Sequence, residues 1–399
     1  MTNPSVKRHP VRAGKIDAVP MLDLHRQYQQ IHEEILRAVE RVCASQHFIL
    51  GAEVEALEKE VAAFTGAAYA VACASGTDAL WLALLAAGIQ PGDAVITTAF
   101  SFFASASAIA RIGARPVFVD IDPQTFNLDP AKLAAKLKAG GARVRAILPV
   151  HLYGQCADMD AIDGIAKEFY VPIIEDAAQA IGAAWKNQRA GSLGLAAAFS
   201  FYPTKNLSAY GDAGMVTTGD PELAEHMRQL RNHGSPQRYL HEELGWNCRM
   251  DAIQAAVLRV KLPYVEDWNQ RRRDRAGDYN RLFEQAGLVK HGTEHPSASV
   301  PMALPYRSAH VHHVFHQYVL RVQRRDELRQ FLTERKISTE IYYPIPLHLQ
   351  PCFEYLGYRE GDLPESELAA KQVLALPMFP ELTEDEQKWV VENIAEFYA

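Results

Sequence analysis

The sequence is poor in cysteine and has no paired cysteine motif. Only 5 of its 399 residues are cysteine, and no two of them have the Cys-x-x-Cys spacing. The spacing therefore indicates neither a disulfide framework nor a cysteine zinc site. Scattered reduced thiols are typical of a cytoplasmic protein, and this is the location that we expect.

The chain also lacks a long apolar run and an excess of basic residues. Its longest apolar stretch covers residues 79–89, far short of the roughly 20 residues that cross a bilayer. Lys and Arg number 41 against 48 Asp and Glu, so the net charge is −7. Because nucleic-acid binders need a basic face for phosphate contacts, we expect neither a nucleic acid nor a membrane as partner.

The remaining composition is that of a folded globular protein, with 48% hydrophobic and 22% charged residues. The polar first residues lack any periodicity, which predicts a flexible tail over residues 1–19. We expect a large α/β domain over residues 20–262 and a smaller α+β domain with its linking helix over residues 263–399.

Strand-like and helix-like segments alternate along the first half of the chain. Strands are predicted at 68–74, 94–97, 115–119, 144–150, 172–175, 196–202 and 215–218, and helices at 23–43, 53–64, 77–87, 102–112, 130–137 and 159–169. Further on, the pattern predicts a helix over 251–282 bent at Pro263, a strand at 314–322, and helices near 326–335 and 384–397. The alternation predicts a mostly parallel sheet covered on both faces, with ligands at the carboxyl ends of its strands.

Three polar features follow predicted strands. Lys205 comes after an apolar strand, where desolvation would lower the pKa of its ammonium group and make the amine a nucleophile. Asp176 ends another apolar strand, and Ser75-Gly76-Thr77 forms a small turn whose N–H groups suit a phosphate. Singly, these features also fit a solvated lysine and a helix N-cap. Together, with Ser200 as a further hydroxyl, they meet the requirements of pyridoxal phosphate: a Schiff-base lysine, an acid at the pyridinium nitrogen and a phosphate anchor.

Several different short motifs occur in a characteristic order along nearly the whole chain. They are Phe48–Gly51, Ala74–Leu80, Pro116–Asp120, Val150–Gly154, Glu175–Gln179, Phe199–Asn206, Arg231–Gly234 and Tyr343–Gln350. In this order and spacing they resemble the DegT/DnrJ/EryC1/StrS sugar aminotransferases, which are pyridoxal phosphate enzymes of fold-type I. The resemblance implies an α/β fold with a mostly parallel central sheet in a large cofactor-binding domain and a smaller C-terminal α+β domain.

The resemblance also implies a role for each matching residue. Lys205 would form the Schiff base and move the proton, Asp176 would face the pyridine nitrogen, and the cofactor would pass through its pyridoxamine form during turnover. The other implied cofactor contacts are Gly76, Thr77 and Ser200 at the phosphate, Phe102 on the ring, Gln179 at the phenolic oxygen, and Asn247 at the phosphate from a second subunit. The active site would then lie at the interface of a homodimer.

The run Tyr342–His348 is most similar to family members that aminate the C3 keto group of a dTDP- or UDP-linked hexose. We therefore expect transamination of a nucleotide-diphosphate-linked deoxyhexose or related sugar, with L-glutamate as amino donor. Candidates for the sugar and diphosphate pocket are Tyr153, Arg249, His313, Tyr343 and His348. His310, His312, His313 and His316 are clustered, but no carboxylate or cysteine at ligand spacing accompanies them, so no metal is expected.

One position departs from the family pattern, and three alternatives stay open. Ala213 stands where the family usually has glycine, and it would be strained if φ were positive there. Members with histidine in place of Lys205 perform dehydration, so the lysine favours transamination. The alternatives are a keto-cyclitol aminotransferase, a pyridoxal-phosphate-binding regulator of the same fold without enzymatic activity, and a lyase or dehydrase that uses pyridoxamine phosphate.

Overall fold

The structure is a computed structural model that describes residues 16–141, 143–290, 292–297 and 299–399. Most of the predicted tail therefore lies outside the described residues. Its last residue, Val19, is buried and pairs with Ile337 in a parallel bridge. The predicted domain boundary between residues 262 and 263 stays a prediction.

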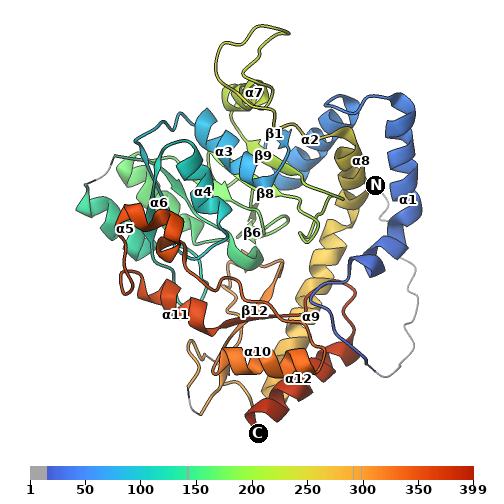
Figure 1. Ribbon diagram of the computed structural model, residues 1–399, viewed down its shortest axis with the longest axis vertical. Coiled ribbons are helices and arrows are strands. Elements are labelled where there is room, and N and C mark those ends of the chain that lie inside the picture. Colours follow the sequence, from blue (N-terminus) through green and yellow to red (C-terminus); the bar gives the residue numbers. More distant parts are fainter. Residues whose placement is uncertain (1–15, 142, 291, 298) are drawn as a thin grey trace.

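A twisted sheet forms the centre of the molecule (Figure 1). Its strands are β1 (Tyr69–Cys73), β2 (Ala94–Thr98), β3 (Arg115–Val119), β4 (Val144–Leu148), β5 (Ile174–Asp176), β8 (Ala196–Ser200) and β9 (Gly214–Thr218). The parallel bridges Ile147–Ile173 and Val150–Asp176 join two sets of strands into the order β1-β9-β8-β5-β4-β2-β3. Of these strands β9 alone runs in the opposite direction to the others. The prediction of a mostly parallel sheet is confirmed.

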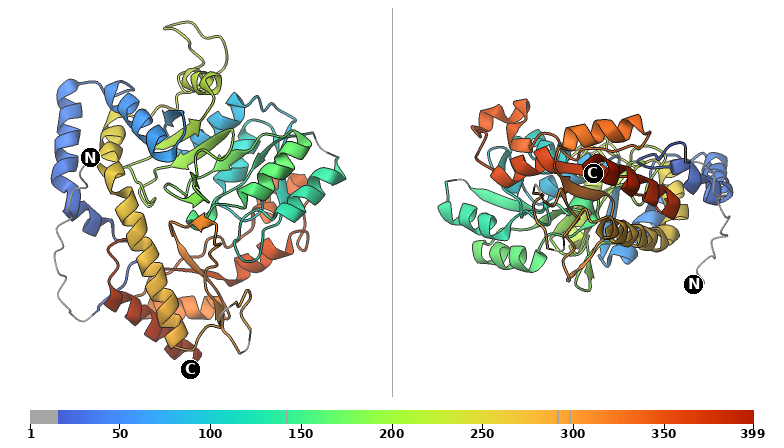
Figure 2. Two further views of the ribbon diagram at one scale, coloured as in Figure 1. Left: turned by 180° about the vertical axis from the view of Figure 1, so that it is seen from behind. Right: turned by 90° about the horizontal axis from the view of Figure 1, so that it is seen from below.

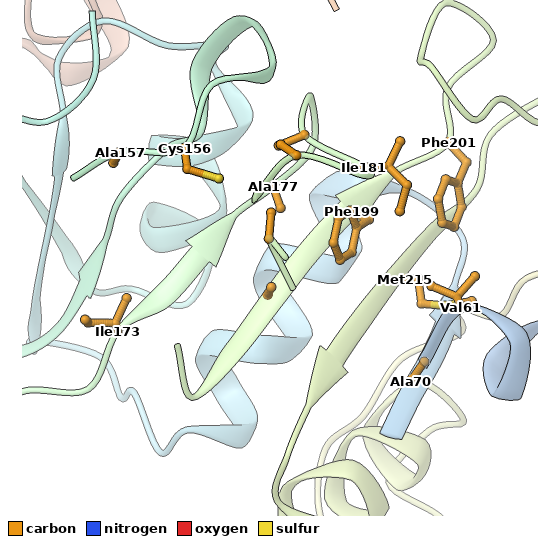
Figure 3. Packing of buried hydrophobic residues seen from close by; sticks show 14 of the residues in the cluster. Val61, Ala70, Cys156, Ala157, Ile173, Ala177, Ile181, Phe199, Phe201 and Met215 are labelled. Atoms are coloured by element: carbon orange, nitrogen blue, oxygen red, sulfur yellow. The ribbon is translucent and has the colours of Figure 1, made fainter. Parts of the chain in front are cut away.

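Helices cover both faces of this sheet because its strands are apolar on both sides. Along β8, Ala197 and Phe199 belong to one buried cluster, and Ala196 and Ala198 belong to the other. The first face is covered by α2 (Ala52–Thr65), α5 (Pro130–Ala139), α6 (Met159–Phe169) and α8 (Ala252–Lys261), and the second by α3 (Gly76–Ala86), α4 (Ala104–Arg111) and α7 (Pro221–Leu230). Figure 3 shows Phe199 of the first cluster beside Ile181 and Phe201.

A second, smaller sheet lies in the C-terminal part. It has the order β10 (Met302–Ala303), β12 (Tyr318–Val322), β13 (Val373–Leu376) and is antiparallel. Around it lie α10 (Arg325–Glu334), α11 (Pro364–Gln372) and α12 (Glu384–Tyr398), and a short sheet of β11 (Val311–His312), β6 (Ala184–Trp185) and β7 (Gln188–Arg189) lies toward the large sheet. This arrangement places residues 311–322 at the junction of the two parts (Figure 1).

Two long helices complete the fold. α1 (Leu24–Ser45) packs beside α8, and α9 (Val265–Gln285) runs from the large sheet to the small one (Figure 2). A 3-10 turn at Leu262–Tyr264 separates α8 from α9, as the bend predicted at Pro263 requires. Among the described helices, none combines the length and the apolar composition that a bilayer span requires.

Candidate active site

A cavity of about 710 Å³ opens at the carboxyl ends of the central strands. Most of the predicted cofactor residues line it: Gly76, Thr77, Phe102, Asp176, Gln179, Ser200 and Lys205. These residues follow different strands, so the crossovers of the parallel sheet bring them to one edge. His316, Gln317, Tyr342 and Tyr343 form the wall contributed by the C-terminal part.

Lys205 lies in the loop that connects β8 to β9. Its backbone N–H donates to the carbonyl of Tyr202 at 2.8 Å, which fixes the turn that carries it. Burial lowers the pKa of its ammonium group to about 8, and the carboxylate of Asp176 partly opposes this shift. At pH 7 about a tenth of Lys205 is therefore the neutral, nucleophilic amine, far more than for an ordinary lysine.

Asp176 is held at the end of β5 by two donors. Its Oδ2 accepts a hydrogen bond from the hydroxyl of Ser105 at 2.6 Å, and its Oδ1 accepts one from the N–H of Ala178 at 3.2 Å. Burial raises the pKa of Asp176, while Ser105, the N–H of Ala178 and Lys205 favour the ionised form. The hydrogen bond from Ser105 was not predicted from the sequence. Ser105 lies on α4, and its hydroxyl is 2.8 Å from that of Ser101, which precedes the helix; no local sequence signal indicates the contact with Asp176.

The neighbouring acid Glu175 has a different task. It points to the other face of the sheet, since adjacent strand residues alternate, and it is fully buried there. Its carboxylate accepts from the ring of His151 at 3.0 Å and from the N–H groups of Gly191, Leu193 and Gly194 at 2.8–2.9 Å. The carboxylate pair seen in the sequence is thus one acid in the cavity and one that fixes a loop.

The turn before α3 fits a phosphate group. Ser75 caps α3, since its hydroxyl accepts from the N–H of Asp78 at 3.1 Å. The N–H groups of Gly76 and Thr77 lie in the first turn, where a helix offers them no partner of its own. A Cβ at Gly76 would stand 2.6 Å from the Cβ of Ser200, so only glycine lets this turn approach β8 so closely. These donors and the hydroxyl of Ser200 surround a space suited to a phosphate dianion.

Gln179 and Tyr343 also line the cavity and are hydrogen-bonded to each other. Gln179 accepts from the N–H of Tyr153 at 2.7 Å and donates to the hydroxyl of Tyr343 at 3.0 Å. Burial raises the pKa of Tyr343, which keeps its hydroxyl protonated. The ring of Phe102 is 57% exposed and lies 6.1 Å from the ring of Tyr343, so one of its faces is free to cover a flat ligand.

Of the five predicted substrate residues, only Tyr343 lines this cavity; three of the other four are buried elsewhere. The hydroxyl of Tyr153 is buried and donates to the carbonyl of Tyr342. His313 is buried against the parallel ring of Phe315 at 3.8 Å, and burial lowers its pKa to about 3, with nearby cationic groups adding to the shift. His348 is buried and its ring pairs with the carboxylate of Glu367 at 3.0 Å. Their roles toward a substrate stay predictions.

Asn247 and Arg249 lie on the segment that follows the projecting loop at the top of Figure 1. Asn247 is exposed, and its backbone forms an isolated antiparallel β-bridge with Asn232. The side-chain oxygen of Asn232 accepts a hydrogen bond from the guanidinium of Arg249 at 3.0 Å. Neither residue lines the cavity of its own chain. This placement leaves the expected contact with a second subunit untested.

Two further expectations concern strain and metal binding. Ala213 has no positive φ, and its carbonyl accepts from the N–H of Phe201 at 2.8 Å, so the condition for strain does not arise. Within the described residues, no group of three or more His, Cys, Asp or Glu side chains is placed to hold a metal ion. The clustered histidines instead include His316, a cavity residue that was not predicted as part of the site.

Comparison with known proteins identifies the family. The profile of the DegT/DnrJ/EryC1/StrS aminotransferase family matches residues 29–395. A protein of Geobacillus stearothermophilus described as a pleiotropic regulatory protein is 53% identical over 380 residues, which are 95% of this chain and 98% of that protein. The dTDP-3-amino-3,4,6-trideoxy-alpha-D-glucose transaminase of Streptomyces venezuelae is 44% identical over 379 residues, 95% of this chain and 96% of that enzyme.

A solved structure gives the same result for the fold. The crystal structure of DesV from S. venezuelae, in complex with a ketimine intermediate, superimposes with a TM-score of 0.89 and 43% identity, covering 96% of this chain and 98% of DesV. The predicted fold-type I architecture is confirmed. The chain belongs to the DegT/DnrJ/EryC1/StrS aminotransferase family.

Proposed function

We propose that the protein transfers an amino group from L-glutamate to the C3 keto group of a nucleotide-diphosphate-linked sugar, with pyridoxal phosphate as cofactor. The observation that carries the proposal is the convergence of Lys205, Asp176 and the Gly76 turn on one cavity. The transaminase from S. venezuelae supports the substrate class, because its name specifies an amino group at C3 of a dTDP-linked sugar. The ketimine in DesV supports the reaction type.

The residues of this chain divide the chemistry among them. Pyridoxal phosphate, when bound, supplies a carbonyl that takes up an amino group and a ring that accepts carbanion charge. The N–H groups of the Gly76 turn and the hydroxyl of Ser200 would hold its phosphate, and Asp176 would keep a proton on its ring nitrogen. Lys205 would hold the cofactor covalently and would move a proton as general base and acid, a task that its pKa of about 8 suits.

Two more residues orient the ring. Phe102 covers one face with its exposed ring. The amide nitrogen of Gln179 has a second hydrogen besides the one given to Tyr343, and this hydrogen would be donated to the phenolic oxygen of the cofactor. Tyr343 is the predicted sugar-pocket residue that lies in the cavity wall.

The first experiment is an absorbance spectrum before and after addition of L-glutamate. A long-wavelength band that fades while 2-oxoglutarate appears is the expected result, and Lys205→Ala is the control that removes the covalent attachment. Absence of the band after addition of pyridoxal phosphate would contradict the cofactor assignment. Product mass then identifies the acceptor, since a 3-keto nucleotide sugar and a keto-inositol give aminated products of different mass.

A regulator without turnover is the second candidate, because the 53% identical relative carries a regulatory name. The two candidates differ in one observable. A regulator would keep the absorbance band unchanged in glutamate, whereas an aminotransferase converts it within a single turnover. The retained pair of Lys205 and Asp176 favours the enzyme.

The site is completed, in this proposal, by Asn247 of a second copy of the chain. Asn247 is exposed, and the loop before it presents the apolar side chains of Tyr239, Leu244 and Trp246 at 83%, 91% and 53% exposure. Side chains of this kind gain from burial against a partner surface. A two-fold homodimer would cover the loop and bring Asn247 to the other subunit's phosphate.

Subunit mixing tests this arrangement. Lys205→Ala and Asn247→Asp proteins are unfolded together, refolded and assayed. If the site is shared between subunits, mixed dimers carry both changes in one site and keep the other intact, so activity returns to roughly a quarter of wild type. If Asn247 serves its own chain, every site is damaged and no activity returns.

A further inference from the structure

A chain of buried amides links the segment of Lys205 to His316. Asn206, the residue after Lys205, donates from Nδ2 to the side-chain oxygen of Asn269 at 2.7 Å and to the carbonyl of Val314 at 3.2 Å. Asn269 in turn donates from Nδ2 to the carbonyl of Ile181 at 3.0 Å. The remaining oxygen of Asn206 lies 3.1 Å from Nδ1 of His316.

The chain has a fixed direction because it starts at a backbone carbonyl. The carbonyl of Ile181 can only accept, so the atom of Asn269 that faces it is the amide nitrogen, and its oxygen faces Asn206. Asn206 must then turn its nitrogen toward Asn269 and its oxygen toward His316. Nδ1 of His316 must therefore carry the hydrogen, and the uncharged ring has its lone pair at Nε2.

The packing around this chain leaves little freedom for another arrangement. Gly182, next to Ile181, has φ of +83°, and a Cβ there would stand 2.6 Å from Nδ2 of Asn269. Asn269 is fully buried and Asn206 is 4% exposed. The amides therefore cannot turn toward solvent, and the orientation of the whole chain is retained.

His316 is buried but opens into the active-site cavity. Its ring is 6% exposed and lines the same space as Lys205. Burial lowers the pKa of His316 well below its usual value, and the cations that face it, Lys205 and Arg272, lower it further. The charged group that faces Lys205 is Asp176. Arg272 touches the segment only through the carbonyls of Phe315 and His316, at 3.3 Å each.

We propose that His316 is a positioning residue of the active site, held by Asn206 as the Nδ1–H tautomer so that Nε2 accepts a hydrogen bond from the amino group of Lys205. The inference rests on the proposed function of Lys205. An uncharged acceptor steadies the lysine without adding a charge to the cavity, and it stabilises the ammonium form more than the amine. The acceptor thus offsets part of the effect that burial has on the lysine.

The tautomer is measured directly on the unaltered protein. Two-bond nitrogen–proton NMR correlations of histidine-labelled protein are recorded, and the signals of His316 are assigned by their loss in His316→Gln. We expect the pattern of the Nδ1–H tautomer with no titration between about pH 6 and 9. An Nε2–H pattern, or titration in this range, would overturn the proposal, whatever cofactor the protein binds.

The effect of His316 on the pKa of Lys205 is measured by attaching the cofactor to the apoprotein. The rate at which added pyridoxal phosphate gains its bound-state absorbance is followed against pH, which gives the apparent pKa of the lysine. His316→Phe removes the acceptor, so we expect this pKa to fall by about one unit. His316→Gln can place an amide oxygen at the position of Nε2 and should restore most of the shift.

The matched control is His312→Gln, because His312 is exposed and does not line the cavity. A His316→Phe protein with the lysine pKa of this control would overturn the proposal, and thermal unfolding checks that both variants are folded. If wild-type protein attaches no pyridoxal phosphate, the proposed function fails, and the tautomer measurement alone then decides on His316.

Discussion

Removal of the hydroxyl of Ser105 tests the role of Asp176 without touching the acid itself. Ser105 donates to Oδ2 of Asp176 at 2.6 Å in a buried setting, and the N–H of Ala178 is the other donor to this carboxylate. Ser105→Ala leaves the helix intact, since alanine is the best helix former. The change therefore acts mainly on the charge of Asp176, and it also removes the hydrogen-bond partner of the Ser101 hydroxyl at 2.8 Å.

The size of the effect follows from the kind of bond. A hydrogen bond to a charged group contributes about 1.5–3 kcal/mol, so its loss raises the pKa of Asp176 by about one to two units. Burial already raises this pKa, and the variant extends the shift in the same direction. Because the ionised acid is needed to hold the proton on the ring nitrogen, the glutamate half-reaction slows by up to about 10-fold to 150-fold at pH values below this pKa, and by less above it.

The assay is the single-turnover rate with L-glutamate, followed by absorbance across pH. The acid limb of the profile should move to higher pH, so that the loss is larger at pH 6 than at pH 9. Ser107→Ala, on the same helix and outside the cavity, is the control. Rates within twofold of this control at every pH would refute the reasoning, as would a loss that does not vary with pH.

Three other changes address packing and buried charge. Gly76→Ala places a Cβ 2.6 Å from the Cβ of Ser200, so titration of the apoprotein should show about 10-fold weaker binding of pyridoxal phosphate. Asp120→Asn should lower the free energy of unfolding by about 1–3 kcal/mol at pH 7. Burial alone would raise the pKa of Asp120, but its donors hold it below the ordinary value, so in urea unfolding the wild type loses this stability as pH falls below about 4 and the variant does not. Burial lowers the pKa of Lys261 to about 7, so folding disfavours its charged form below pH 10, and Lys261→Met should stabilise the protein by about 1–2 kcal/mol at pH 7. Thermal unfolding from pH 7 to 10 checks that this gain shrinks as pH rises.

Local signals predicted the elements that carry their own start and stop residues. The helix predicted at 159–169 is α6 with the same bounds, because Asp158 caps its first turn and Tyr170 ends it in the left-handed conformation. α7 and β13 were not predicted, and β13 is only four residues long, too short for a clear alternation. The strand predicted from residue 314 begins at Tyr318, since the N–H of Val314 is taken by the carbonyl of Gly154 instead of a sheet partner.

The candidate site shows the same division. Residues at strand ends, such as Lys205 and Asp176, are visible in the sequence because a polar group after an apolar run is unusual. Ser105 lies 71 positions before Asp176, and no local pattern connects the two. His316 depends on a chain of three amide contacts that exists only in the folded protein. Residues that act through tertiary contacts therefore cannot be predicted from the sequence alone.

The helix α9 has a mechanical consequence. Its 21 residues make a rod of about 31 Å, with Val265 in the core of the large sheet and Tyr279 and Phe283 in the core of the small one (Figure 2). Any rotation of one sheet against the other must bend this rod or pull one end out of its core. The two sheets should therefore melt in a single cooperative transition.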